Sequence, residues 1–304
     1  MENPLLELQE YENLQEALKK AKGPVQATGT LDSQKVHLMY WLGKDGGFPW
    51  KLVVTYDDQR AREIYDDFRS FTENVWLYPA KDLLFYSADI HGNLMTRQRI
   101  AVWRHLMEEE EGVVVTTLDG LMDHLLPLVF LKQQAVTVEN GQIMDLDEWK
   151  ERLTALGYER TAQVDGMGQF SIRGGIVDIF PLTEEVPVRI ELWDDEVDSI
   201  RSFDPESQRS VEQLEKITIY PSAETILTKK QLEAGIERLE KEEKEYEAAL
   251  RAKHQIEEAS RIRGIIKELT EGIRQGWKRD GLDAYIRYFC PATVSFLDYF
   301  PAGD

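Results

Sequence analysis

Hydrophobic and polar residues alternate along the middle of the chain with the period of two that a half-buried β-strand requires. The alternation covers four short segments, residues 169–173, 176–180, 188–192 and 196–200. Glycine, proline or aspartate interrupts the pattern between them. Short alternating segments separated by such turn residues predict a compact antiparallel sheet with one face on a core and one face in water.

The predicted solvent face of this sheet carries charged residues. If Phe170 and Val188 point toward the core, the alternation places Arg173, Arg189 and Glu191 on the opposite face. A guanidinium group pairs with carboxylates through two parallel hydrogen bonds, which suits a protein-docking surface. The alternative is that these side chains are simply solvated, since most surface ion pairs contribute little.

The N-terminal part of the chain alternates strand-like and helix-like segments. The predicted strands are residues 51–56, 75–78 and 113–117, and the predicted helices are 57–71, 94–107 and 118–126. Strands that alternate with helices predict a parallel sheet covered on both faces, and therefore an α/β class. An amphipathic helix precedes this region, and residues 25–43 read as a strand, a turn and a helix.

The C-terminal part is predicted to be helical. Apolar residues at helical spacing predict one long helix, a break near His254 and a second helix, and we expect both to pack on the first domain. Before the sheet, residues 145–156 read as a helix that Asp145 or Asp147 can cap and Gly157 closes. The expected domains are residues 1–127, 128–213 and 214–304.

Composition narrows the function classes. The formal net charge of the 304 residues is −20 without any block rich in lysine and arginine, so little direct DNA binding and no anionic membrane partner is expected. The single cysteine, Cys290, cannot form an intramolecular disulfide, and the N-terminus does not resemble a secretory signal, so a cytoplasmic protein is expected. The five histidines lack ligand spacing, and no catalytic residue, metal or cofactor is assigned.

The sheet segment also carries a specific resemblance. The sequence GQFSIRGGIVDIFP, followed by VPVRIELWDDEVDSIRSFDPESQRS, resembles the N-terminal UvrB-homology module of the transcription-repair coupling factors, the Mfd family. The resemblance implies a degenerate P-loop-helicase-like parallel sheet domain with an inserted small α+β domain and a C-terminal helical segment. It also implies that the inserted domain docks on UvrA. The residues that match the docking positions of UvrB are Arg160, Arg173, Arg189 and Glu191, whereas Ser171 replaces a further UvrB arginine.

The loop that aligns with the phosphate-binding Walker A loop of UvrB consists of Thr28, Gly29, Thr30, Leu31, Asp32 and Ser33. Leu31 stands where the last glycine is expected, and Asp32 stands where the lysine is expected. A carboxylate at this place repels the phosphates, so nucleotide binding is not expected. The DNA-inserting hairpin of UvrB is also missing, because residues 80–99 run almost directly into a helix.

The favoured interpretation is a recruitment module that binds UvrA and brings nucleotide excision repair to a stalled RNA polymerase. The resemblance implies that the full-length proteins of this family are ATP-dependent DNA translocases, and that their motor and polymerase-binding domains lie outside this chain. The alternatives are a P-loop ATPase or helicase domain, which Asp32 disfavours, and a domain that binds damaged DNA directly, which the net charge of −20 disfavours.

Overall fold

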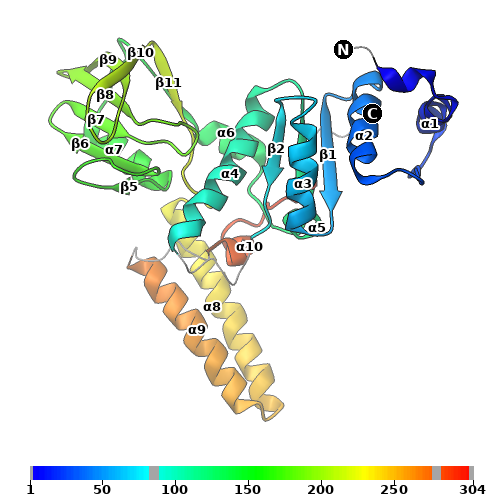
Figure 1. The fold of residues 1–304 in the computed structure, drawn as a ribbon. Helices are drawn as coiled ribbons and strands as arrows, with labels where there is room; N and C mark the ends of the chain where they lie inside the picture. The colour runs from blue at the N-terminus through cyan, green and yellow to red at the C-terminus, as the bar shows by residue number, and fades with distance from the viewer. Residues whose placement is uncertain (1–2, 82–88, 276–281, 301–304) are drawn as a thin grey trace. The chain divides into compact units, whose positions relative to one another are not determined.

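The computed structural model describes residues 3–81, 89–275 and 282–300. Residues 82–88, which belong to the segment where the UvrB hairpin is expected to be missing, and the C-terminal residues 301–304 lie outside the described residues. The chain divides into two compact units, residues 1–81 with 105–122 and residues 82–104 with 123–304. The fold is a mixture of helices with one parallel and one large antiparallel sheet (Figure 1). The division into three domains stays a prediction.

The first unit is built on a three-stranded parallel sheet in the order β1-β3-β2. Its strands are β1 (Trp50–Thr55), β2 (Val75–Tyr78) and β3 (Gly112–Thr117), and all six residues of β3 are buried. Asp57 precedes helix α3 (Asp58–Phe68), and its side chain caps the helix by accepting from the backbone N–H of Arg60. The buried face of α3 and the strands share a core that includes Phe68, Val113 and Val115.

The same unit holds the short helix η1 (Pro4–Glu7), α1 (Gln9–Lys20), α2 (Asp32–Asp45), α5 (Leu118–Leu121) and the last turn of α4 (Asp89–Glu108). The strand that the sequence predicts ahead of α2 does not form: residues 21–31 contain no strand and are mostly exposed. A strand needs a hydrogen-bonded neighbour for its backbone groups, and this segment has no ladder partner among the described residues. Helix α5 is also shorter than the predicted 118–126.

The second unit is built on a six-stranded sheet in the order β10-β9-β8-β7-β6-β5 (Figure 1). The strands are β5 (Glu159–Arg160), β6 (Gln169–Arg173), β7 (Ile176–Ile179), β8 (Val188–Trp193), β9 (Glu196–Phe203) and β10 (Ser210–Leu214). Strands β6 to β10 pair antiparallel, and only the two-residue β5 pairs parallel to its neighbour β6. The antiparallel sheet predicted from the alternation is therefore present, with its four predicted strands in β6 to β9.

One face of this sheet packs against helix α7 (Leu146–Ala155). The core contains Phe170, Val177 and Ile190 from the strands, together with Trp149 and Leu153 from α7. Asp145 caps α7 as predicted, because its carboxylate accepts from two backbone N–H groups of the first turn. A separate strand pair, β4 (Val136–Glu139) with β11 (Lys216–Ile219), contributes to the same core.

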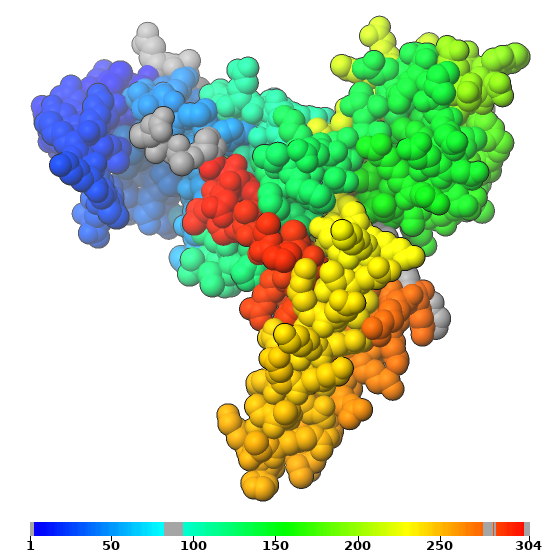
Figure 2. All heavy atoms as spheres, turned by 180° about the vertical axis from the view of Figure 1, so that it is seen from behind, coloured from blue at the N-terminus to red at the C-terminus, as the bar shows by residue number. Residues whose placement is uncertain are grey.

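The chain continues into a helical hairpin. Helix α8 (Lys229–Ala252) ends before His254, which has a left-handed φ of 59°, and α9 (Ile256–Arg274) follows. The predicted long helix, break and second helix are confirmed, and the two helices lie side by side (Figures 1 and 2). Helix α6 (Leu128–Gln134), the 3-10 turns η2 (Leu282–Tyr285) and η3 (Phe296–Tyr299), and α10 (Ile286–Phe289) complete the unit. None of the described helices has the length and apolarity needed to cross a membrane.

Candidate docking face

The six-stranded sheet presents its second face away from the α7 core, and we call this surface the outer face. Residues directly opposite each other on paired strands share a face. One row across the outer face is Ser171, Asp178, Arg189, Arg201 and Gln213, and a second row is Arg173, Ile176, Glu191 and Ser199. The strands thus bring Arg173, Arg189 and Glu191 onto one surface, as the alternation predicts.

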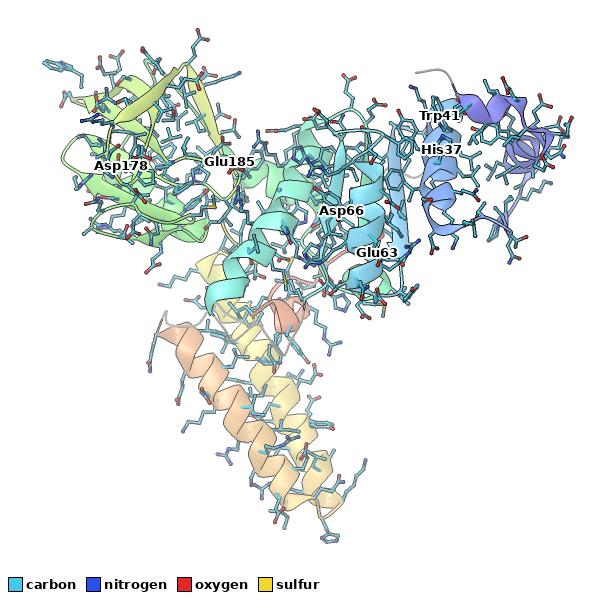
Figure 3. All side chains as sticks on the ribbon, viewed as in Figure 1. His37, Trp41, Glu63, Asp66, Asp178 and Glu185 are labelled. Atoms are coloured by element: carbon cyan, nitrogen blue, oxygen red, sulfur yellow. The ribbon has the colours of Figure 1, made fainter. Side chains whose placement is uncertain are left out.

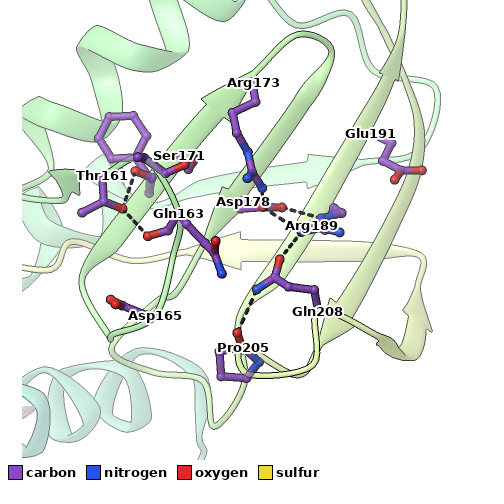
Figure 4. Close-up of polar contacts among 12 residues, drawn as sticks. Thr161, Gln163, Asp165, Ser171, Arg173, Asp178, Arg189, Glu191, Pro205 and Gln208 are labelled. Atoms are coloured by element: carbon purple, nitrogen blue, oxygen red, sulfur yellow. Dashed lines mark hydrogen bonds and ion pairs between the residues drawn. The ribbon is translucent and has the colours of Figure 1, made fainter.

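Asp178 is the centre of this face. Its side chain is only 1% exposed, yet it meets two guanidinium groups (Figure 4). Arg173 donates from Nη2 to Asp178 Oδ2 at 2.8 Å, and Arg189 donates from Nε to Oδ1 at 2.6 Å and from Nη2 to Oδ2 at 2.9 Å. These hydrogen-bonded guanidinium groups compensate the cost of burying the carboxylate. Figure 3 places Asp178 among the strands of this sheet.

The two arginines are held to different extents. The side chain of Arg189 is 15% exposed, whereas that of Arg173 is 47% exposed. Arg189 also donates from Nη2 to Gln208 Oε1 at 2.8 Å, and its guanidinium carbon lies 4.5 Å from the centroid of the Phe203 ring. The hydrogen bonds to Asp178 raise the pKa of Arg189, so its positive charge is secure. Arg189 is therefore fixed, while Arg173 reaches into solvent.

Glu191 forms the negative part of the face. Its carboxylate accepts from Arg201 Nη2, and from Ser199 Oγ at 3.4 Å. The side chains of Glu191 and Arg201 are 29% and 33% exposed. Three arginines and two carboxylates give these five residues a charge of +3 − 2 = +1, in a chain whose net charge is −20. These five ion-paired side chains therefore carry a small positive charge on an acidic protein.

Two residues differ from the simple alternation picture. Ser171 lies on the outer face but is buried, because the segment after β5 covers it: Ser171 Oγ donates to the carbonyl oxygen of Ala162 at 3.1 Å. Arg160 is exposed on β5, opposite Phe170, whose side chain faces the core. The register therefore does not place Arg160 in either row with Arg173 and Arg189.

Trp193 lies on the same face, although the sequence analysis did not single it out. It follows Arg189 and Glu191 on β8 at alternate positions, and it pairs with Glu196 at the end of the hairpin. Its side chain is 81% exposed. Tryptophan and arginine are enriched among the residues that dominate binding energy at protein interfaces. The signal was present in the sequence VRIELW, because the alternation that exposes Arg189 and Glu191 also exposes Trp193.

The candidate nucleotide loop lies in the first unit, ahead of α2. Gly29 has a left-handed φ of 86°, and Leu31 is the N-cap residue of α2 with 72% of its surface exposed. Asp32 begins the helix and pairs with Arg60 Nη2 at 3.1 Å and with Lys35 Nζ at 3.3 Å. One turn into α2, His37 Nε2 accepts from Trp41 Nε1 at 2.9 Å (Figure 3). A carboxylate therefore occupies the first turn, where a phosphate would need positive charge.

Comparison with known proteins finds a family whose model matches the region that forms this sheet and its outer face. Residues 136–224 match the family model of the UvrB interaction domain. The matched residues include β4 to β11 and the whole outer face, so this part of the chain is similar to that domain.

The wider chain is similar to particular curated proteins. It is 34% identical over 252 residues to the transcription-repair-coupling factor of Bacillus subtilis (strain 168), a match covering 82% of this chain and 21% of that protein. It is also 34% identical over 179 residues to the transcription-repair-coupling factor of Staphylococcus aureus (strain MRSA252), covering 58% of this chain and 15% of that protein. The resemblance inferred from the sequence is confirmed. The matches span about a fifth or less of the length of these relatives.

Proposed function

We propose that this chain is the UvrB-like recruitment module of a transcription-repair coupling factor and that it binds UvrA. In this proposal the full-length protein is an ATP-dependent DNA translocase that acts at a stalled RNA polymerase. The module then brings the nucleotide excision repair machinery to that place. Its work is protein recognition and involves no catalysis.

One observation carries the proposal. The domain that matches the UvrB interaction domain presents Arg173, Arg189, Glu191 and Trp193 together on the outer face of its sheet. Such a set combines bidentate pairing groups with a large exposed aromatic ring, which are the features of residues that dominate protein interfaces. Arg160 is exposed on the edge strand β5 opposite the core-facing Phe170, and it is proposed as a further contact at this edge of the sheet, off the outer face.

We further propose that the loop of residues 28–33 is a degenerate relative of the Walker A loop and does not bind nucleotide. The support is electrostatic: Asp32 aligns with the lysine position, so an exposed carboxylate lies where the phosphates would need a positive charge. ATP hydrolysis would then belong to motor domains outside this chain. Direct binding to DNA is expected to be weak, since the net charge is −20.

Binding of the 304-residue chain to purified UvrA tests the proposal. The test variant combines Arg173→Ala with Trp193→Ala, because the two residues are 47% and 81% exposed and neither replacement adds a carboxylate beside the buried Asp178, which keeps Arg189. We expect micromolar or tighter binding by the wild type and at least about a hundredfold weaker binding by the variant. Arg189→Glu is a poorer choice, because it would place a second carboxylate against the buried Asp178.

The chain offers a matched control in helix α8. Arg251→Ala with Tyr246→Ala makes the same two kinds of change at side chains that are 51% and 53% exposed, away from the sheet. This control is expected to bind like the wild type. Equal binding by the test variant and the wild type would move the site off the outer face, and a folded wild type that does not bind UvrA would refute the proposed function.

Calorimetric titration with Mg-ATP tests the nucleotide proposal. We expect no binding at millimolar nucleotide, because the carboxylate of Asp32 opposes the phosphates. Saturable binding that depends on residues 28–33 would show that the loop still holds nucleotide.

A further inference from the structure

Arg189 is surrounded by groups whose geometry fixes its position. Three groups contact its guanidinium. Arg189 donates from Nε and Nη2 to the carboxylate of Asp178 and from Nη2 to the amide oxygen of Gln208 (Figure 4). The centroid of the Phe203 ring lies 4.5 Å from the guanidinium carbon. A long arginine side chain in water samples many rotamers, and ordering it at an interface costs binding free energy. Here that ordering is already present in the unbound chain.

Asp178 also orients the second arginine. Its Oδ2 accepts from both Arg173 and Arg189, at 2.8 Å and 2.9 Å, so one buried carboxylate sets the spacing of the two guanidinium groups. With 1% of its side chain exposed, Asp178 itself has almost no surface to offer a partner. Its contribution to binding must therefore act through the arginines.

Gln208 is held in an unusual backbone conformation. It has a left-handed φ of 60°, which costs free energy for a residue with a side chain. Its amide Nε2 donates to the carbonyl oxygen of Pro205 at 2.8 Å, which aims Oε1 at Arg189. The turn that contains it is closed by the backbone N–H of Gln208, which donates to the carbonyl oxygen of Asp204 at 2.8 Å. Strain retained beside a charged group points to a role for that geometry.

We propose that Asp178 and Gln208 are positioning residues that fix Arg189, and through Asp178 also Arg173, in the orientation that the partner binds. This inference rests on the proposed function and adds the residues that preorganise the docking face. Preorganisation lowers the cost of ordering side chains in the complex, so its loss is expected to appear as faster dissociation.

The substitution Asp178→Asn distinguishes a positioning role of Asp178 from an effect of its charge on UvrA binding. The substitution raises the summed charge of the five outer-face residues from +1 to +2, while it weakens the clamp. If Asp178 acted through charge alone, the association rate with UvrA and its salt dependence would change, while the dissociation rate stayed the same. Positioning predicts the opposite, a dissociation rate about tenfold faster.

Gln208→Gly separates positioning from fold stability. Glycine adopts the left-handed conformation without strain, so this variant is expected to melt at the wild-type temperature or above it. It nevertheless loses the hydrogen bond to Arg189, and its complex with UvrA should dissociate about three- to tenfold faster. A merely structural role would lower stability and binding together.

The mobility of the Arg189 Nε–H group, measured by NMR relaxation on the free chain, tests the clamp without any partner. We expect a rigid group in the wild type and a mobile one in both variants, with surface plasmon resonance on immobilised UvrA giving the rates. The α8 variant Glu247→Gln, which removes one carboxylate from an ion pair outside the sheet, should match the wild type in both measurements.

A mobile Arg189 in the wild type, or wild-type dissociation rates in both variants, would overturn the positioning role. A wild type with a rigid Arg189 that does not bind UvrA would instead overturn the proposed function, and the positioning role for this partner with it.

Discussion

At the scale of single residues, Arg99 on α4 is the most deeply buried charge in the described chain. Its side chain is 0% exposed, and its guanidinium lies 2.7 Å from the carboxylate of Asp123 and 2.9 Å from that of Glu224. The side chain of Glu224 is itself only 7% exposed. This cluster joins α4 to the segment after β11 within the second unit, and its stability depends on the positive charge of Arg99.

Replacing Arg99 by methionine should therefore lower the free energy of unfolding by about 3–5 kcal/mol, because it removes the buried cation that pairs with Asp123 and with Glu224, whose side chain is itself buried. Urea denaturation followed by circular dichroism measures the change. Lys20→Met is the control, since Lys20 and its partner Glu16 are 76% and 67% exposed, and a cost of about 0.5 kcal/mol or less is expected there. Similar costs for the two substitutions would contradict this reading of the cluster.

Sequence alone could place residues on a face but could not say which of them are buried there. Period-two alternation correctly directs Phe170 inward and Arg173, Arg189 and Glu191 outward. Burial of Asp178 and Ser171 on the outer face depends on contacts with Arg189 and Ala162, which are distant in sequence or belong to an irregular segment. Alternation reports the direction of a side chain and carries no information about such cover.

At the scale of secondary-structure elements, the sequence correctly predicted the start of a helix where a single side chain caps it. Asp145 caps α7 through its Oδ1, which accepts from the backbone N–H of Asp147 at 2.8 Å and of Glu148 at 3.0 Å. The sequence left Asp145 and Asp147 open as caps, and the structure selects the first. The strand predicted at residue 25 failed, because strand formation depends on a partner that composition does not reveal.

Asp145→Ala should consequently destabilise the protein by about 1 kcal/mol through loss of the cap. Asp147→Ala should cost less, about 0.3–0.5 kcal/mol, since it removes only a favourable charge in the first turn. Thermal melts of the two variants distinguish them. A larger effect at Asp147 would mean that the cap is misassigned.

The helical hairpin gives a second element-scale prediction, from two glycines that lie within helices. A Cβ added at Gly235 on α8 would overlap the ring of Phe289 on α10, whereas a Cβ at Gly264 on α9 would meet nothing within 4 Å. Gly235→Ala should therefore destabilise by about 1–3 kcal/mol despite its better helix propensity. Gly264→Ala should stabilise by up to about 1 kcal/mol. Equal effects in denaturant melts would argue against close packing of α8 on α10.

At the scale of the whole molecule, two buried tyrosines link stability to pH. Tyr158 donates its hydroxyl to the carbonyl oxygen of Tyr220 at 2.7 Å, and Tyr299 donates to that of Leu126 at 2.5 Å. Burial raises the pKa of both phenols above its ordinary value, and a nearby glutamate adds to each shift. The folded state therefore keeps these protons at a pH where the unfolded chain has released them.

Because the folded pKa is the higher one, the stabilisation is complete below about pH 10 and is lost as the pH rises further. Each tyrosine should lower the free energy of unfolding by roughly 1.4 kcal/mol per pH unit above about pH 10. Urea melts at several pH values between about pH 8 and about pH 11 measure the slope. Tyr158→Phe should make it shallower, and an unchanged slope in this variant would contradict the assignment.

The strand pair β4–β11 brings together two segments near the ends of the region that matches the UvrB interaction domain. Val136 lies opposite Ile219, and the matched region runs from residue 136 to residue 224. Val136 and Ile219 are thus one strand spacing apart, about 5 Å. A longer chain could carry such a region in place of a surface loop without rebuilding its own core.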